Sequence, residues 1–485
     1  MKKRKKNRNY IFTTLAFLMI LIFSINAVTK LLSKKDSIAK YGDMMKTQNF
    51  DVLFMGTSHV LNGIFPMELW NDYGIVSYNC GGNANQLPTT YHVMNNVLKY
   101  YHPKLVVLDV YCIESNDKII QGRSGVDCQH ISFDWLPLTK EKIEAVNFLF
   151  DDIETKLEFI FPISIYHERW MGLKESDFKI NYNLQKGADC GWHYSRTRDF
   201  ELIDKTDMIQ EDSLGKQYLA KMIELCQEKG IEILLINIPY PATKEQQQWA
   251  NSVQVIADEY KVEYLNLMYE ETGVNLNTDC QDIDSHLNSS GGRKVTDFLG
   301  KHLQKHYNMP DRRMDENYSD WYEDYKAYSA YKWQNLIDTK NDINAYLSIL
   351  QDNNLNICLY FNGDSEIMKD DVTTDMVLNI ANLQQLKDAC AHRKDYFAII
   401  DNNEQQICEY TGDEAIDSIS TSFAKFSLSE KKDGTRCLYL NDVELNLLLN
   451  GNGTTAELVI VSFDKNSGEM VDWAKFDTQK SVSGS

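Results

Sequence analysis

Ser58 has the position in this chain that best suits nucleophilic chemistry. It follows the apolar run 51–55 in the sequence Met55-Gly-Thr-Ser-His59. An apolar run that ends at a glycine predicts a buried strand entering a tight turn, and such a turn can lift a serine hydroxyl above the carboxyl end of a sheet. Taken alone, the pattern is weak and is at least as typical of a serine that caps a helix. His59 is interpreted as a structural hydrogen-bonding residue without a catalytic part.

A histidine with two nearby carboxylates lies much later in the chain. The sequence Asp282-Ile-Asp284-Ser-His286 stands in a predicted loop just before a helix. A histidine flanked in this way can accept the proton of a serine hydroxyl while one carboxylate fixes its tautomer. Ser58 and His286 together therefore form a candidate pair of nucleophile and general base.

Short apolar runs that alternate with helical patterns must position these groups. Strands are predicted at 51–55, 104–110, 231–238 and 262–267, and helices at 89–101, 214–229, 243–260 and 289–307. This alternation predicts a parallel sheet with helices on both faces. In such a sheet, the residues that follow the strands gather at the carboxyl edge. The α/β unit is expected to end near residue 310.

The order of these motifs resembles the SGNH (GDSL-like) hydrolase superfamily over roughly residues 51–307. The resemblance rests on the strand-Gly-x-Ser pattern and on Asp284-Ser-His-Leu-Asn288. It implies a flavodoxin-like, three-layer αβα fold with Ser58 as nucleophile, His286 as general base and Asp284 as orienting carboxylate. Many members place the acid three residues before the histidine, where this chain has Ile283, so Asp282 is the alternative acid.

The resemblance also implies an oxyanion hole, in which the N–H of the nucleophile acts beside a glycine N–H and an asparagine side chain. The segment Tyr78-Asn-Cys-Gly-Gly-Asn-Ala-Asn85 is a good second block. We expect Gly82 to donate its N–H together with that of Ser58, with Gly81 as runner-up, because glycine lets the backbone approach a substrate closely.

A side-chain donor to the oxyanion is expected from Asn79, Asn83 or Asn85. The family's third block, Gly-x-Asn-Asp, is missing after the strand predicted at 104–110, where the sequence continues Tyr111-Cys-Ile-Glu-Ser-Asn-Asp117. The third oxyanion donor is therefore left open.

The first thirty residues predict a membrane anchor. Six of the first eight residues are basic, and the 21 residues from Asn9 to Thr29 include no charged one. As a helix they would reach about 31 Å, close to the roughly 30 Å of a bilayer core. The basic flank should stay in the cytoplasm, which sends the residues after Lys30 to the outer face. A cleaved signal peptide is the competing interpretation, with a poor cleavage site at 25–27.

The C-terminal third of the chain has a different sequence pattern. A helical connector rich in charges and aromatics is predicted at 311–341, and short alternating runs with Asn-Gly and Asn-Asn turns predict a β-rich accessory domain at 342–485. Residues 456–477 loosely resemble the interleukin-like (ILEI) β-domain, which implies glycan or partner binding outside the cell. The expected organisation is an anchor at 1–36, an SGNH-like domain at 37–310, the connector and the accessory domain.

Charge and cysteine usage limit the function classes. Apart from the six basic residues at the start, 44 Lys and Arg stand against 70 Asp and Glu, so the chain repels nucleic acid. The ten cysteines have neither Cys-x-x-Cys pairs nor metal-ligand spacing, and no metal or other cofactor is predicted.

Within the superfamily, the anchor and the two motifs resemble proteins of teichoic acid D-alanylation and alginate O-acetylation. The resemblance implies a serine esterase or O-acyltransferase on the outer side of the cell membrane, acting on a cell-envelope or secreted polysaccharide. A membrane-bound O-acyltransferase is a candidate partner. The alternative is a non-catalytic glycan-binding or scaffolding envelope protein with the same fold.

Overall fold

The computed structural model divides the chain into two compact units. The first contains Met1–Asp189, Phe200–Thr272 and Thr296–Trp321, and the second contains Cys190–Asp199, Gly273–Val295 and Tyr322–Ser485. The described residues are 2–33, 40–42, 44, 49–178, 184–412, 414–432, 436–445, 447, 456–477 and 482–483. The division does not follow a single boundary near residue 310, because two internal segments group with the C-terminal residues.

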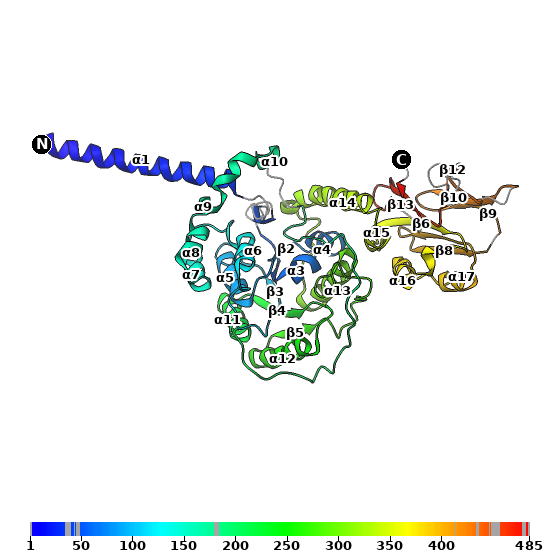
Figure 1. Ribbon diagram of the computed structural model, residues 1–485, viewed down its shortest axis with the longest axis horizontal. Coiled ribbons are helices and arrows are strands. Elements are labelled where there is room, and N and C mark those ends of the chain that lie inside the picture. The colour runs from blue at the N-terminus through cyan, green and yellow to red at the C-terminus, as the bar shows by residue number, and fades with distance from the viewer. Residues whose placement is uncertain are drawn as a thin grey trace. The chain divides into compact units, whose positions relative to one another are not determined.

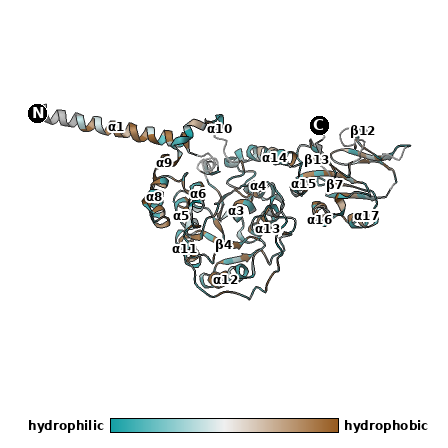
Figure 2. Ribbon diagram, viewed as in Figure 1, coloured by the Kyte–Doolittle hydropathy of each residue, from teal (hydrophilic) through white to brown (hydrophobic). Residues whose placement is uncertain are grey.

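A long helix, α1 (Lys2–Leu32), opens the first unit. Its stretch Tyr10–Leu32 is long and apolar enough to cross a membrane. The large apolar side chains between Tyr10 and Val28 are exposed, and Figure 2 shows their apolar colour along the helix. The apolar helix expected from the sequence is therefore present.

A five-stranded parallel sheet in the order β2-β1-β3-β4-β5 forms the centre of the first unit (Figure 1). Its strands are β1 (Val52–Gly56), β2 (Ser77–Gly81), β3 (Leu105–Asp109), β4 (Glu232–Asn237) and β5 (Glu263–Asn266). Strands β1, β2 and β3 are buried along their whole length, as parallel strands covered on both faces must be. In this strand order the winding of the sheet reverses between β1 and β3, and ligands of doubly wound sheets commonly bind beyond the carboxyl ends of the strands at such a point.

Four of these strands confirm predictions from apolar runs, whereas β2 was not predicted as a strand. Its sequence Ser77-Tyr-Asn-Cys-Gly81 lacks a continuous apolar run, although all five residues are buried. Pairing with β1 over five residues places β2 in the sheet. Tertiary contact here outweighs local β propensity.

Helices follow the strands along the chain, as the alternation predicted. Those of the first unit are α3 (Ser58–Gly63), α4 (Pro66–Tyr73), α5 (Leu87–Val97), α6 (Arg123–Phe133), α7 (Lys140–Leu149), α8 (Ile153–Ile160), α9 (Ile163–Tyr166), η2 (His167–Gly172), α10 (Glu175–Phe178), α11 (Leu214–Lys229), α12 (Lys244–Tyr260) and η3 (Glu316–Tyr318). Helices α13 (Ser289–Tyr307) and α14 (Asp320–Asp338) contribute residues to both units.

Local caps define the boundaries of several helices. Ser213 caps α11 by accepting the N–H of Lys216, and Gly230 ends that helix in the left-handed conformation. Thr243 and Gln246 form a capping box at the start of α12. The helices predicted at 214–229, 243–260 and 289–307 are confirmed.

Antiparallel strands dominate the C-terminal part of the second unit. A six-stranded sheet has the order β15-β14-β13-β6-β7-β8, and a four-stranded sheet has the order β12-β11-β10-β9. The strands are β6 (Leu355–Phe361), β7 (Tyr396–Asp401), β8 (Gln406–Thr411), β9 (Ile416–Ser420), β10 (Lys425–Glu430), β11 (Arg436–Leu440), β12 (Val443–Leu445), β13 (Leu458–Asp464), β14 (Met470–Phe476) and β15 (Val482–Ser483). The helices are α15 (Ile343–Leu350), η4 (Ile367–Lys369), α16 (Asp371–Ile380) and α17 (Leu386–His392).

Strand β6 of the larger sheet is buried on both faces. Leu355, Ile357 and Leu359 of β6 belong to a core shared with α15, α16 and α17. Cys358 and Tyr360, on the opposite face, belong to a core shared with the four-stranded sheet. The alternation follows from the period of two along a strand.

Candidate active site

Ser58 is the first residue of α3, directly after β1 and the turn at Gly56 and Thr57. The helix cap is Thr57, whose Oγ1 accepts the backbone N–H of His59 at 3.2 Å. Capping, the structural alternative for Ser58, is thus performed by its neighbour. Ser58 itself is half-buried and follows β1, an interior strand of the sheet, where an α/β nucleophile is expected.

Two glycines let α3 approach the sheet closely. Gly56 has a φ of 153°, and a Cβ there would lie 2.7 Å from Val60 Cγ2. Gly81 is its register partner in β2, and a Cβ on Gly81 would lie 2.6 Å from Leu61 N and 2.7 Å from Thr57 O. A larger residue at either position would push α3 away from the sheet and displace Ser58.

Aromatic side chains from the ends of two other strands pack beside the serine turn. The ring of His59 stacks on Tyr111 with centroids 3.8 Å apart and meets Tyr240 edge-on at 5.0 Å. Tyr111 follows β3, and Tyr240 follows β4. His59 is buried in this cluster.

Asp109, the last residue of β3, is a buried carboxyl group beneath the same turn. A Cβ on Gly56 would lie 3.0 Å from the Cβ of Asp109. Its Oδ1 accepts the N–H of Ile238 at 3.2 Å, whereas Oδ2 makes no hydrogen bond to any residue that the structure describes. Burial raises the pKa of Asp109 to about 7. This group was not predicted from the sequence, where Asp109 is one polar residue in an apolar run.

The glycine N–H groups predicted as oxyanion donors take part in the fold. The N–H of Gly82 donates to the carbonyl of Gly56 at 3.1 Å and continues the ladder between β1 and β2. The N–H of Gly81 donates to Asn79 Oδ1 at 2.9 Å. An oxyanion would have to displace one of these bonds.

The asparagines of this block are placed differently from one another. Asn79 is fully buried, and its Nδ2 donates to the carbonyls of Val60 and Ile64, so it joins β2 to α3. Asn85 is also buried and accepts the hydroxyl of Ser132. Asn83 is half-buried in the turn after β2. Of the three, Asn79 has an amide group whose nitrogen and oxygen both form hydrogen bonds within the fold.

Asp282 orients His286. Its Oδ2 forms a short hydrogen bond with Nδ1 of His286, and its Oδ1 accepts the backbone N–H of His286 at 3.0 Å. Burial opposes ionisation of Asp282, but the hydrogen bonds from the His286 side chain and from the backbone outweigh it and hold its pKa well below the usual range. With Nδ1–H directed at Asp282, the Nε2 of His286 is the basic ring nitrogen.

The geometry favours Asp282 over Asp284, the acid named first in the sequence analysis. The chain turns tightly here, and Asp282 Oδ1 also accepts the N–H of Asp284 at 3.3 Å and that of Ser285 at 2.8 Å. This turn brings residue 282 back to the ring of residue 286 and leaves Asp284 as a backbone donor. Ser285 Oγ lies 2.8 Å from the same Nδ1.

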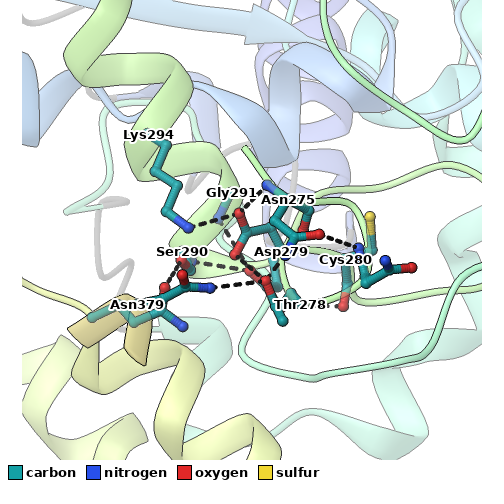
Figure 3. A network of polar contacts seen from close by, with 11 residues as sticks. Asn275, Thr278, Asp279, Cys280, Ser290, Gly291, Lys294 and Asn379 are labelled. Carbon is teal, nitrogen blue, oxygen red and sulfur yellow. Dashed lines mark hydrogen bonds and ion pairs between the residues drawn. The ribbon is translucent and has the colours of Figure 1, made fainter. Parts of the chain in front are cut away.

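A buried polar network holds the segment that carries His286 (Figure 3). Asp279 is fully buried, and its Oδ2 pairs with Lys294 Nζ at 2.8 Å and accepts the N–H of Asn275 at 2.8 Å. Thr278 Oγ1 donates to the other oxygen of Asp279 and accepts a hydrogen bond from Asn379. These contacts fix the start of the segment to α13 and α16.

Asn288 fixes the other end of the same segment. Its Nδ2 donates to the carbonyls of Thr278 and Cys280, and its Oδ1 accepts the N–H groups of Ser290 and Gly291 at the start of α13. An antiparallel bridge between Cys280 and Leu287 closes the loop between the two ends. Asn288 was noted in the sequence only as part of the motif after His286, and Asp279 and Lys294 were not singled out, because only the folded chain brings the three together.

The residues of the predicted triad belong to different units. Ser58 and its glycines lie in the first, whereas Asp282 and His286 lie in the second. Ser58 has the position of a nucleophile at the end of a strand, and His286 with Asp282 has the hydrogen bonding of a base with an orienting acid. No protein-family model, curated protein or solved structure matches this chain.

Proposed function

We propose that the chain is an SGNH-type serine esterase or O-acyltransferase, with Ser58 as nucleophile, His286 as general base and Asp282 as the acid that orients it. The observation that carries the proposal is the hydrogen bond between Asp282 and Nδ1 of His286. It fixes the tautomer in which Nε2 can take a proton from a serine hydroxyl. The location of Ser58 directly after β1, an interior strand of a parallel sheet, supports its role as nucleophile.

The proposed reaction has two halves. As His286 accepts its proton, Ser58 Oγ attacks the ester carbonyl, and the protonated histidine then returns that proton to the leaving alcohol. The acyl group is left on Ser58. Water or a sugar hydroxyl, deprotonated by His286, attacks this acyl-enzyme and restores the serine, so hydrolysis and transfer differ only in the acceptor.

The substrate class follows from the resemblance and from the N-terminal helix. An anchor with a basic cytoplasmic flank would hold the catalytic part at the outer face of the cell membrane, where envelope and secreted polysaccharides are found. Such a protein could receive acyl groups from a membrane-bound O-acyltransferase. The antiparallel strands of the second unit suit an ILEI-like accessory domain that binds glycan or a partner.

Fluorophosphonate labelling of the full chain in detergent tests the catalytic assignment. The parent protein should react with the probe, and Ser58→Ala should not. Asp282→Asn should slow labelling by roughly 10³–10⁴-fold, because loss of the orienting carboxylate favours the wrong tautomer. Asp284→Asn is the matched control and should label at nearly the parent rate. Equal labelling of Asp282→Asn and Asp284→Asn would remove the role given to Asp282.

Turnover of p-nitrophenyl acetate with an added oligosaccharide separates hydrolysis from transfer. Release of p-nitrophenol that depends on Ser58 would establish the acyl-enzyme. Acetylated oligosaccharide in the same reaction would identify a transferase, whereas acetate alone would identify an esterase.

The second candidate is a glycan-binding or scaffolding protein without turnover. It is favoured by the internal hydrogen bonds of the Gly81 and Gly82 N–H groups, which were expected to face an oxyanion. Such a protein would not react with the fluorophosphonate probe but would still bind polysaccharide in a pull-down. Probe labelling lost in Ser58→Ala would exclude this candidate.

A further inference from the structure

Four large apolar side chains of the first unit are exposed on neighbouring short elements. Phe161 follows α8, Trp170 and Met171 belong to η2, and Phe178 ends α10; each is more than half exposed. We call these four residues the apolar patch. Exposed aromatic side chains gathered in one region mark an interaction site more often than scattered ones do.

The elements that carry the apolar patch pack against the end of α1. Helices α9, η2 and α10 each contact α1, and Figure 1 shows α9 and α10 near its end. Arg169, next to Trp170, donates to the carbonyls of Leu32 and Ser33, at 2.6 Å in both cases. These are carbonyls at the C-terminal end of a helix, which have no partner within the helix and attract a cation.

The same arginine joins the end of α1 to α10. Arg169 Nη2 pairs with Asp177 at 2.8 Å, and the other carboxylate oxygen of Asp177 accepts the N–H of Lys174 at 2.9 Å. Asp177 is buried. Arg169 thus joins η2 and α10, which carry three of the four residues of the apolar patch, to the end of α1.

The length of α1 gives the depth of this site in a membrane. The 23 residues of Tyr10–Leu32 extend about 35 Å as a helix, against a hydrocarbon core of about 30 Å and head-group layers of roughly 5–7 Å on each side. If the helix crosses the core, Leu32 lies at the level of the head groups. Arg169 and Trp170 then lie at the same level, where arginine and tryptophan side chains are favoured.

We propose that the apolar patch inserts into the head-group region of the membrane leaflet from which α1 emerges, so that the first unit lies against the lipid surface. This rests on the membrane insertion of α1 that the proposed function includes. Because α1 keeps the apolar patch beside the bilayer, even a weak affinity for the interface suffices to keep it inserted. The bilayer is favoured over a protein partner because the contacts with α1 themselves place the patch at the lipid surface.

Bromolipid quenching of tryptophan fluorescence tests this proposal on the full chain in vesicles. Among the eight tryptophans, all within the described residues, Trp170 is the one with a largely exposed side chain. Phosphatidylcholine brominated at acyl carbons 6 and 7 should quench part of the parent emission. Trp170→Phe should abolish that quenched part, whereas Trp192→Phe, a partly buried control in the second unit, should retain it.

A second variant leaves the reporter in place. Met171→Glu combined with Phe178→Glu should reduce the quenching of Trp170, because two carboxylates oppose insertion of the patch. Quenching that is absent from the parent, or unchanged by Trp170→Phe, would overturn the proposal and leave the patch to a protein partner.

Flotation of the vesicles in alkaline carbonate reports separately on α1. If the chain floats with the vesicles but Trp170 is not quenched, the membrane anchor is supported and the inferred contact of the apolar patch with the lipid surface is contradicted. A chain that is stripped from the vesicles would contradict both the anchor and the contact. The catalytic assignment is tested independently by the fluorophosphonate probe.

Discussion

Asp109 in the first unit and Asp279 in the second are both fully buried, yet their surroundings are opposite. Asp279 has an ion-pair partner in Lys294 and accepts further hydrogen bonds. Asp109 has backbone donors on one oxygen, and its other oxygen makes no hydrogen bond to any described residue. A buried carboxylate is costly unless it is paired, which is why burial raises the pKa of Asp109 to about 7.

The two regions around these carboxyl groups are also held differently. The serine turn is shaped by backbone approach at Gly56 and Gly81, where any side chain would collide with α3. The segment of His286 is held by side chains, above all Asp279 and Asn288. Changes of backbone volume should therefore disturb the serine region, and changes of charge should disturb the histidine region.

Asp109→Asn should have the largest effect on stability, and the effect should depend on pH. The pKa of Asp109 is near 7 in the folded protein and about 3.9 in an unfolded chain, so the unfolded state loses its proton first as the pH rises. Parent stability should therefore fall, relative to the variant, by about 1.4 kcal/mol per pH unit between pH 4 and 7, and by about 4 kcal/mol in total. Denaturant unfolding of both proteins across this range measures the difference. Parallel pH profiles would show that Asp109 does not titrate as inferred.

Lys294→Met should cost about 3 kcal/mol, because it leaves the buried carboxylate of Asp279 without its counter-charge. Lys301→Met in the same helix is the matched control. Lys301 pairs with Asp297, but both side chains are largely exposed, so its loss should cost about 0.5 kcal/mol or less. Hydrogen exchange at residues 275–291 should accelerate in the first variant only. Equal losses of unfolding free energy in the two variants would show that the ion pair of Lys294 with Asp279 does not hold the His286 segment in place.

Gly81→Ala should destabilise the first unit by about 2 kcal/mol, since the new Cβ would meet two backbone atoms of the α3 turn closer than 3 Å. Gly172→Ala is the control, because nothing lies within 4 Å of a Cβ at that position. Its unfolding free energy should stay within about 0.5 kcal/mol of the parent value. If Gly81→Ala were equally harmless, close backbone approach would not be what places Ser58.

The sequence predicted those parts of the fold that depend on short-range patterns. Apolar runs marked β1, β3 and β4, a mixed run marked β5, and helical patterns at 214–229 and 243–260 marked α11 and α12. The strand-end position of Ser58 and the carboxylates before His286 were also visible, because both motifs are local. Alternation of strands and helices then sufficed to predict a parallel sheet.

Features that depend on distant residues could not be predicted in this way. Strand β2 is polar in sequence and is defined by its pairing with β1. The network of Asp279, Asn288 and Lys294 needs the start of α13 folded back on the loop before it. The choice of Asp282 over Asp284 depends on a tight turn that spacing alone does not reveal.

Thr57→Ala and Ser58→Ala should have the smallest effects on stability, and their difference separates a structural residue from a chemical one. Thr57 caps α3, so its loss should cost about 1 kcal/mol, whereas Ser58 is the first residue within the helix and should cost only a few tenths of a kcal/mol. Labelling by the fluorophosphonate should show the opposite order, complete loss in Ser58→Ala and retention in Thr57→Ala. If Ser58→Ala hardly changes the unfolding free energy but abolishes labelling, the Ser58 hydroxyl acts in the chemistry. If Ser58→Ala is instead the more destabilising variant and labelling persists, the hydroxyl stabilises the fold and the nucleophile is another residue.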